Sequence, residues 1–273
     1  EKFSIYHKER FFDVGIAEEH AVTFACGLAS KGMRPVFAVY STFLQRSYDQ
    51  IIHDAAMSGL HIVLAIDRAG IVGDDGETHQ GVFDVSMLNS IPNVTIFSPT
   101  YFDGLKCALN SAIYVCNNVA AVRYPRGGEL YKPDDFGEES ITYDVYGNKD
   151  CGKLIITYGR LFSYACKAKE MLAEKGIEVC ILKLCKIKPI DPSAFDFATE
   201  FNTVWFFEEG IKTGSVARNF GDARQFNGCY HIKTIGDKFV KQMSVSEALH
   251  MLKLDAEGMA DVVLEDLDRI GNR

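Results

Sequence analysis

The sequence lacks the features of a membrane or exported protein. No apolar run among its 273 residues reaches the roughly 20 that a membrane-spanning helix needs. Residues 1–10 are polar and lack the apolar centre of a signal peptide. Acidic residues outnumber basic ones, and the net charge of −8 argues against non-specific nucleic-acid binding. At 47% hydrophobic and 24% charged, the composition is typical of a soluble globular protein with one large domain or two of ordinary size.

Cysteine pairs of the C-x-x-C type are also absent. Most of the eight cysteines lie inside apolar periodic runs, which favours buried free thiols in a reducing compartment. A zinc site or a disulfide framework is the alternative. The cysteines are Cys26, Cys107, Cys116, Cys151, Cys166, Cys180, Cys185 and Cys229.

Strand and helix patterns alternate from the start of the chain, with no internal repeat or low-complexity tract. Apolar runs predict buried strands at residues 34–40, 61–67, 93–97 and 120–124. Helical patterns accompany them at residues 17–31, 43–58 and 101–117. Alternation of this kind predicts crossover connections and a mainly parallel sheet that is covered on both faces.

The pattern lapses after residue 127. Residues 128–150 carry Gly, Pro, Asp and Glu clusters without a long period, which predicts a linker between domains. A second series follows, with strands expected at residues 153–157, 178–184 and 203–207 and helices at 161–175, from 192, at 244–252 and from 255. The predicted fold class is therefore α/β, with two consecutive domains at 1–127 and 151–273, each a mainly parallel sheet flanked by helices.

Residues 13–20, Asp-Val-Gly-Ile-Ala-Glu-Glu-His, predict a strand end, a glycine turn and a helix that opens on an acidic pair. Such a turn would put Glu18 at the lip of a cleft, where a carboxylate can meet a bound heterocycle. Acidic residues are favoured in the first turn of any helix, so a purely structural role stays open for this motif alone. Small residues along the same helix suit either close packing on its own sheet or a dimer contact; they are Ala21, Ala25, Gly27 and Ala29.

A second motif, Tyr-Ser-Thr-Phe-Leu-Gln-Arg at residues 40–46, follows a predicted strand. An aromatic side chain at the carboxyl end of a strand can stack on a flat ring, which makes Phe43 a candidate ligand contact. Taken alone, Phe43 is more typical of a core residue. Arg46 has the pattern of a helix-surface or interface arginine, and we do not expect it to be catalytic.

Residues 67–81 predict a long glycine-bearing loop after the strand at 61–67. Ligands in such sheets bind beyond the carboxyl ends of the strands. A neutral His79 in this loop could take or give a proton. Arg68 and Arg126 each follow a strand at the same expected edge, and two converging guanidinium groups suit a phosphate monoester. Either arginine alone is more typical of a surface ion pair.

Other histidines receive weaker interpretations. We expect structural roles for His20 and His53. No motif surrounds His7, His61, His231 or His250.

Together with Arg-Tyr-Pro-Arg-Gly at residues 123–127, these segments resemble the pyrimidine-binding half of a thiamine diphosphate (ThDP) enzyme of the transketolase superfamily. The 1-deoxy-D-xylulose-5-phosphate synthase family is the nearest match. Residues 11–127 match it closely. Residues 150–273 match the transketolase C-terminal domain more loosely, through residues 188–191 and 235–239.

The resemblance implies roles for individual residues. Glu18 matches the carboxylate that activates the cofactor by bonding N1′ of the aminopyrimidine, and His79 is the second catalytic residue. The residues expected at the cofactor are Glu18, Ile16 and Phe43. The residues expected at the substrates are Tyr40, Arg68, Asp75, His79 and Arg126. An acidic turn at residues 208–210 resembles one that has an organising rather than a chemical role.

The resemblance also implies an activity: condensation of pyruvate with glyceraldehyde 3-phosphate to 1-deoxy-D-xylulose 5-phosphate and CO₂. The product feeds isoprenoid, thiamine and pyridoxal synthesis. We expect a homodimer in the bacterial cytoplasm or the plastid stroma.

One family motif is missing from the sequence. ThDP enzymes hold Mg²⁺ and the diphosphate through Gly-Asp-Gly and a downstream Asn, and residues 73–76, Gly-Asp-Asp-Gly, have the wrong spacing. The family carries this motif in an N-terminal domain, in the same chain or another. Because the anchor for the diphosphate is missing, we expect this piece to be inactive alone. The chain also begins with Glu1 rather than Met, and we interpret it as a processed or trimmed piece.

Two alternatives to a synthase fragment stay open. The first is the smaller subunit of a split transketolase, which would share Glu18 and the general fold. The second is a scaffold or regulatory domain that has lost the cofactor, which the presence of Glu18, Phe43 and His79 disfavours.

Overall fold

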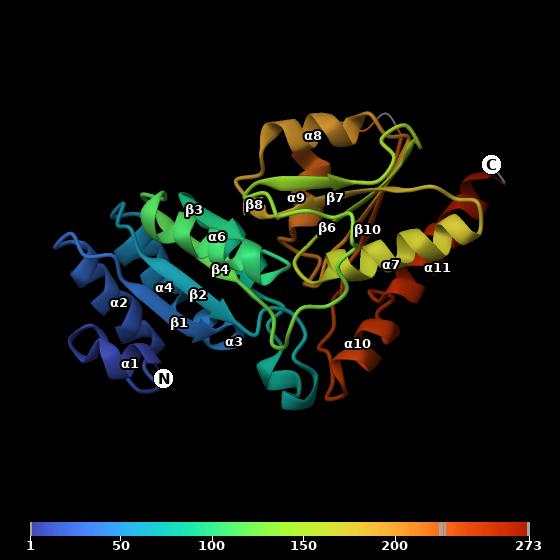
Figure 1. The fold of residues 1–273 in the computed structure, drawn as a ribbon. Helices are drawn as coiled ribbons and strands as arrows, with labels where there is room; N and C mark the ends of the chain where they lie inside the picture. The colour runs from blue at the N-terminus through green and yellow to red at the C-terminus, as the bar shows by residue number, and fades with distance from the viewer. Residues whose placement is uncertain (1, 224–225, 227, 272–273) are drawn as a thin grey trace.

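Two five-stranded sheets organise the chain, and Figure 1 shows them side by side with helices packed around each. This computed structural model describes residues 2–223, 226 and 228–271. The first sheet has the order β1-β2-β4-β3-β8, and the second has the order β10-β9-β6-β7-β5. All neighbours are parallel except the edge strands β8 and β5, which pair antiparallel with β3 and β7.

The first sheet is built from short apolar strands. They are β1 (Val36–Tyr40), β2 (Val63–Asp67), β3 (Val94–Phe97) and β4 (Val119–Arg123). Every residue of β3 and β4 is buried, as expected for parallel strands that are covered on both faces. The helices of this half are α1 (Lys2–Tyr6), α2 (Glu18–Ala29), α3 (Ser41–Leu44), α4 (Tyr48–Gln50), α5 (Asp84–Asn89) and α6 (Phe102–Tyr114). Its single turns are η1 (Lys8–Arg10), η2 (Gln45–Ser47), η3 (Ile51–Ala56), η4 (Gly73–Asp75) and η5 (Glu77–His79).

The second sheet follows the same principle. Its strands are β5 (Tyr143–Tyr146), β6 (Lys153–Tyr158), β7 (Cys180–Leu184), β9 (Thr203–Phe207) and β10 (Cys229–Lys233). Its helices are α7 (Leu161–Glu174), α8 (Pro192–Thr199), α9 (Val216–Ala223), α10 (Val245–Met251) and α11 (Ala256–Gly271). Helix α7 packs on β6 and β7, and α11 runs along α7. None of the helices in the described part of the chain is long and apolar enough to cross a membrane.

The two halves share their packing. Strand β8 (Lys186–Lys188) comes from the second half of the chain but closes the edge of the first sheet, with Phe97 opposite Lys186 and Ile96 opposite Lys188. One hydrophobic cluster contains Ile96 of the first sheet together with Phe206 of the second. The loops at the ends of the first sheet are therefore held against the second domain.

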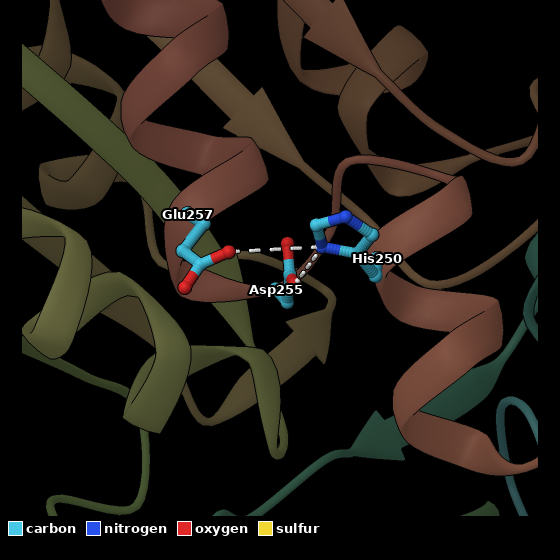
Figure 2. A group of neighbouring side chains, drawn as sticks. All are labelled: His250, Asp255 and Glu257. Carbon is cyan, nitrogen blue, oxygen red and sulfur yellow. Dashed lines mark hydrogen bonds and ion pairs between the residues drawn. The ribbon is translucent and has the colours of Figure 1, made fainter.

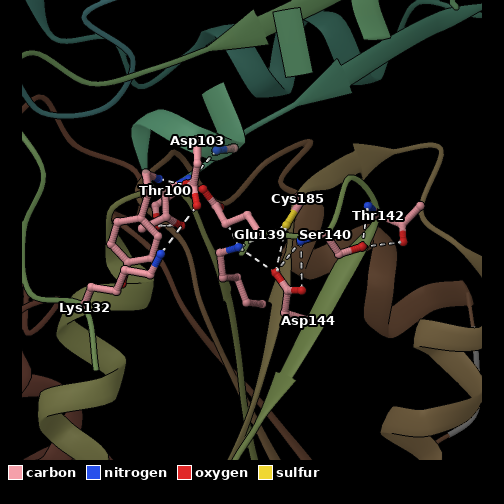
Figure 3. Close-up of polar contacts among 12 residues, drawn as sticks. Thr100, Asp103, Lys132, Glu139, Ser140, Thr142, Asp144 and Cys185 are labelled. Atoms are coloured by element: carbon pink, nitrogen blue, oxygen red, sulfur yellow. Dashed lines mark hydrogen bonds and ion pairs between the residues drawn. The ribbon is translucent and has the colours of Figure 1, made fainter. Parts of the chain in front are cut away.

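The segment predicted to be a linker is also tied to both halves (Figure 3). Strand β5 lies inside residues 128–150 and pairs with β7. The carboxylate of Glu139 accepts hydrogen bonds from the backbone N–H groups of Thr100 and Tyr101 at 2.8 and 2.7 Å, at the start of α6. It also pairs with the buried Lys183 of β7 at 2.5 Å.

Other sequence predictions differ from the structure in detail. Residues 11–17 form no strand, so the expected strand end before the glycine turn is wrong; instead Asp13 accepts a hydrogen bond from the N–H of Gly15, which has a φ of 65°. The helix expected at 43–58 is divided into α3, η2, α4 and the π-helical turn η3.

The cysteines are free thiols, but only half of them are buried. Cys107 and Cys229 are exposed, and Cys116 and Cys151 are partly exposed. The expectation of buried thiols holds for Cys26, Cys166, Cys180 and Cys185.

Candidate functional site

The carboxyl ends of the parallel strands bring the predicted residues to one edge of the first sheet. Tyr40 ends β1 and lies in register with Asp67, which ends β2. Arg123 ends β4 beside Ile66. The loops that leave these strands therefore meet at this edge, where α2 also begins. Residues from distant parts of the sequence lie together there because parallel strands share their direction.

Glu18 is the first residue of α2 and is 8% exposed. Its Oε1 accepts a hydrogen bond from Nη1 of Arg46 at 2.9 Å. Its Oε2 is buried and has no hydrogen-bond partner among the described residues. A buried carboxylate oxygen without a partner is costly, so this atom is suited to a ligand that carries an N–H group. The aminopyrimidine ring of ThDP meets that requirement.

Aromatic and guanidinium groups form a row beside Glu18. The guanidinium of Arg46 lies 4.9 Å from the ring centre of Phe43, and Phe43 stacks on Tyr40 at 5.7 Å. The guanidinium of Arg68 lies 3.8 Å from the ring centre of Tyr40. His79 lies beside this row. Its imidazole makes a T-shaped contact with Phe43, with ring centres 5.4 Å apart. Cation–π contacts of this kind fix the orientation of the rings.

The two predicted phosphate arginines do converge, but on Asp75. The Nη1 atom of Arg126 lies 3.1 Å from both carboxylate oxygens of Asp75, and Nε of Arg68 lies 3.5 Å from Oδ2. The Arg68 contact is an ion pair and not a well-formed hydrogen bond, since Nε has no hydrogen-bond partner among the described residues. Asp75 therefore holds the two guanidinium groups together and leaves one donor of Arg68 unused.

His79 lies in the same loop, half-buried. Its Nδ1 contacts the hydroxyl of Thr78 at 2.9 Å. Gly76 separates the two single turns of the loop with a φ of 79° and a ψ of −173°, a conformation that essentially only glycine adopts. Ile16, by contrast, is 90% exposed. The described part of the chain therefore does not hold its side chain in place for the predicted contact with the cofactor.

Two residues of the second domain form hydrogen bonds with the backbone of this loop. Glu209 accepts a hydrogen bond from the N–H of Ile71 at 2.6 Å and forms a buried ion pair with Arg160. Arg160 in turn donates to the carbonyl of Ile71 at 2.6 Å. A Cβ at Gly70 would lie 2.6 Å from the Glu209 carboxyl carbon, so only glycine fits there. We call Arg160, Glu209 and the Ile71 backbone the loop clamp.

Sequence analysis expected an organising role for the turn that contains Glu209, but it missed the partners of Glu209 in the loop clamp and the contact between Arg46 and Glu18. The clamp joins residues 138 positions apart, and no periodicity signals such a contact. The motif at residues 40–46 did include Arg46, but its spacing gave no sign that the guanidinium reaches back to α2.

A possible metal-binding group lies elsewhere. Among the described residues, the donor atoms of His250, Asp255 and Glu257 lie within 4.8 Å of one another (Figure 2). Ordinary contacts account for the arrangement, because Asp255 pairs with Nδ1 of His250 at 2.8 Å and accepts the N–H of Gly258 at 2.9 Å. Around Glu18, the residues suit the cofactor ring but do not supply the several oxygen ligands that Mg²⁺ requires.

Comparisons with known proteins identify both domains of the chain. Residues 1–129 match the family model "Transketolase, pyrimidine binding domain", and residues 148–259 match "Transketolase, C-terminal domain". A 1-deoxy-D-xylulose-5-phosphate synthase from Clostridium botulinum is 41% identical over 272 residues, covering 96% of this chain and 43% of the relative. One from Helicobacter pylori (strain G27) is 40% identical over 266 residues, covering 94% and 43%. The chain thus spans less than half the length of these curated relatives.

Solved structures share the fold. A structure titled "Split gene transketolase, inactive beta4 tetramer" has a TM-score of 0.82 at 23% identity, covering 96% of this chain and 85% of that one. A transketolase from Campylobacter jejuni has a TM-score of 0.77 at 16% identity, covering 93% and 39%. By the two family models, the chain belongs to the transketolase family and comprises a pyrimidine-binding domain followed by a C-terminal domain.

Proposed function

We propose that this chain is the part of a 1-deoxy-D-xylulose-5-phosphate synthase that binds the pyrimidine of ThDP and the phosphorylated acceptor. The whole enzyme would condense pyruvate with glyceraldehyde 3-phosphate and release CO₂. Curated relatives with that name at 40–41% identity support the assignment. The observation that carries it is the buried Oε2 of Glu18, which has no partner among the described residues.

The bound cofactor supplies the stabilisation of a carbanion equivalent derived from pyruvate. Glu18 would share a proton with N1′ of the aminopyrimidine through its free Oε2. Arg46 holds the other oxygen of the same carboxylate and so favours the orientation in which Oε2 faces the ring. Phe43 offers a partly buried aromatic face beside it.

The acceptor would bind on the other side of the aromatic row. Arg68 and Arg126 already lie together around Asp75, and an acceptor phosphate would share or replace that carboxylate as their partner. His79 would move a proton at the substrate oxygen, while Tyr40, stacked between Phe43 and Arg68, would form the wall of the site.

The remaining parts of the site would come from a further domain, in the same chain or another, which would hold Mg²⁺ and the diphosphate. A homodimer in the bacterial cytoplasm or plastid stroma is part of this proposal. A matching two-domain structure carries the printed description "inactive beta4 tetramer", which supports our expectation that the present chain has no turnover alone.

The second candidate is the smaller subunit of a split transketolase. The observation that favours it is the length of the split-gene structure, 85% of which this chain covers. The donor substrate separates the two candidates, because a synthase consumes pyruvate whereas a transketolase consumes a ketose phosphate.

The test uses the complete enzyme and a matched pair of variants. Glu18→Gln should lower kcat with pyruvate and glyceraldehyde 3-phosphate by about 10²–10⁴-fold, the range for loss of acid–base chemistry. Glu19→Gln, at the exposed neighbouring position, should stay within about twofold of wild type. A Glu18→Gln enzyme with wild-type kcat would overturn the proposed role, and turnover of a ketose phosphate in place of pyruvate would favour the second candidate.

A further inference from the structure

A cavity of about 520 Å³ lies in the second domain, between the edge strand β10 and helix α11. Its volume falls within the range of roughly 300–1,000 Å³ that small-molecule pockets occupy. Val262 of α11 and the buried Trp205 of β9 contribute apolar surface to its lining. None of the residues assigned above to the cofactor, the substrates or the loop clamp lines this cavity.

A fixed histidine lies at the wall of the cavity. Trp205 is 1% exposed and stacks on His231 with ring centres 5.7 Å apart. Oδ2 of Asp266 accepts the indole N–H of Trp205 at 3.2 Å and pairs with Nδ1 of His231 at 3.2 Å. The contact of Nδ1 with Asp266 and the stacking on Trp205 therefore fix the orientation of the imidazole. The other nitrogen, Nε2, is buried and has no partner among the described residues.

The charges around the cavity are unbalanced. Three cationic side chains, Lys233, Lys253 and Arg269, line it together with two carboxylates, Glu265 and Asp266. Lys253 pairs with Glu265 at 2.6 Å, and Arg269 pairs with Asp266 at 3.1 Å. These pairs satisfy both carboxylates.

Lys233 is the cation that remains. Within residues 2–223, 226 and 228–271 it forms no ion pair or side-chain hydrogen bond. Burial, followed by the positive charges of Lys253 and Lys238, lowers its pKa, and the charge of Glu265 offsets this only in part. An ammonium group that is partly desolvated and lies near other cations is stabilised by a nearby anion.

We propose that this cavity binds a small organic anion, whose phosphate or carboxylate group contacts Lys233 and Nε2 of His231. One anionic group can bind both atoms. It accepts a hydrogen bond from the Lys233 ammonium and, when the His231 imidazole is protonated, another from Nε2. The volume leaves room for an organic portion beside Val262 and Trp205. This site is independent of the proposed synthase activity.

Trp205 makes the proposal directly measurable, because it is the one tryptophan of the chain and lies in the cavity wall. The full chain is titrated at constant pH and ionic strength with inorganic pyrophosphate in one series and citrate in another, and tryptophan fluorescence is recorded. We expect saturation at about 1 mM or below with at least one probe. The stronger probe shows whether phosphate or carboxylate is preferred.

Matched variants assign the signal to the cavity. Lys233→Met should weaken binding at least tenfold, whereas Lys233→Arg, which keeps the charge, should retain it. Lys241→Met removes an exposed lysine outside the lining and should leave the midpoint unchanged. No saturable change with either probe, or equal midpoints for wild type and Lys233→Met, would overturn the proposal.

Discussion

The two oxygens of the Glu18 carboxylate have different surroundings. Oε1 is held by Arg46, and Oε2 is buried without a partner among the described residues. A surface acid would instead have both oxygens in water. Arg46 also stacks on Phe43, so one guanidinium orients both the carboxylate and the ring beside it. We therefore interpret Arg46 as a positioning residue.

Removing that guanidinium should affect turnover more than substrate binding. In the complete enzyme, Arg46→Met should lower kcat about 10–100-fold, since hydrogen bonds to charged groups contribute roughly 1.5–3 kcal/mol. The KM for pyruvate should change by less than about threefold, because Arg46 contacts no proposed substrate residue.

Steady-state kinetics of three variants check this prediction. Arg46→Lys should recover part of kcat, and Arg34→Met, at an exposed arginine before β1, should behave as wild type. A purely structural role would give the same loss in Arg46→Lys as in Arg46→Met, together with a lower Tm.

His250 illustrates a different effect of a neighbouring carboxylate. Its hydrogen bond to Asp255, together with the charges of Asp255, Glu257 and Asp261, raises its pKa above 6.5. The folded protein therefore binds the proton more tightly than the unfolded chain. The resulting stabilisation is fully present below about pH 6.5 and is lost as the pH rises through the folded pKa.

The histidine resonances measured by NMR across the pH range test this interaction. Asp255→Asn should bring the His250 titration down toward its ordinary value, because the first and largest cause is removed. Glu257→Gln should lower it less, since Glu257 lies 3.9 Å away and acts through charge alone. An unshifted wild-type midpoint for His250 would contradict the prediction.

At the scale of elements, the central strands could be predicted because they are mainly apolar and almost wholly buried. Strands β2, β4, β6, β7 and β9 all coincide with runs recognised in the sequence. Strand β5 reads Tyr-Asp-Val-Tyr, is only partly buried and lies within a segment rich in turn formers, so the sequence did not reveal its pairing with β7. Strand β8 has three residues, and only its pairing with β3 makes it a strand.

The candidate site was predictable to the same degree. Its motifs lie at strand ends, and the shared direction of parallel strands brings them together. What the sequence did not reveal is which charges pair. Arg68 and Arg126 could be foreseen to converge, but not that Asp75 would lie between them.

The segment between the domains is held by a buried charge cluster. Lys183 is fully buried and contacts Glu139 at 2.5 Å and Asp144 at 2.8 Å, with Cys185 at 3.1 Å. Glu139 also binds the start of α6, so the cluster links β5, β7 and the first domain (Figure 3).

Lys183→Met should lower the free energy of unfolding by about 3–5 kcal/mol, because it leaves two carboxylates without their cation. Urea denaturation measures the change. Lys186→Met, in the neighbouring strand β8 and partly exposed, should cost less than about 1 kcal/mol. Adding Glu139→Gln and Asp144→Asn to Lys183→Met should recover part of the loss, and a loss below 1 kcal/mol in Lys183→Met would contradict the account.

At the scale of the whole molecule, the second domain helps to fix the loop of the first domain that carries Asp75 and His79. The loop clamp places a buried carboxylate and guanidinium of the second domain on the backbone of the loop that carries Asp75 and His79. The two adjacent acidic residues have different partners. Glu209 accepts a hydrogen bond from the N–H of Ile71. Glu208 caps α9 by accepting hydrogen bonds from the N–H groups of Val216 and Ala217 at 3.1 and 2.7 Å. The geometry of the candidate site thus depends on contacts between the domains.

This difference gives a paired test by hydrogen exchange. Glu209→Gln removes the charge that pairs with Arg160, so the Ile71 amide and residues 68–81 should exchange at least about tenfold faster while the start of α9 stays protected. Glu208→Gln should do the reverse, exposing the amides of Val216 and Ala217 and sparing the loop. If both variants raised exchange everywhere, they would be reporting a general loss of stability. If Glu209→Gln left Ile71 as protected as in wild type, the second domain would not be what holds the loop in place.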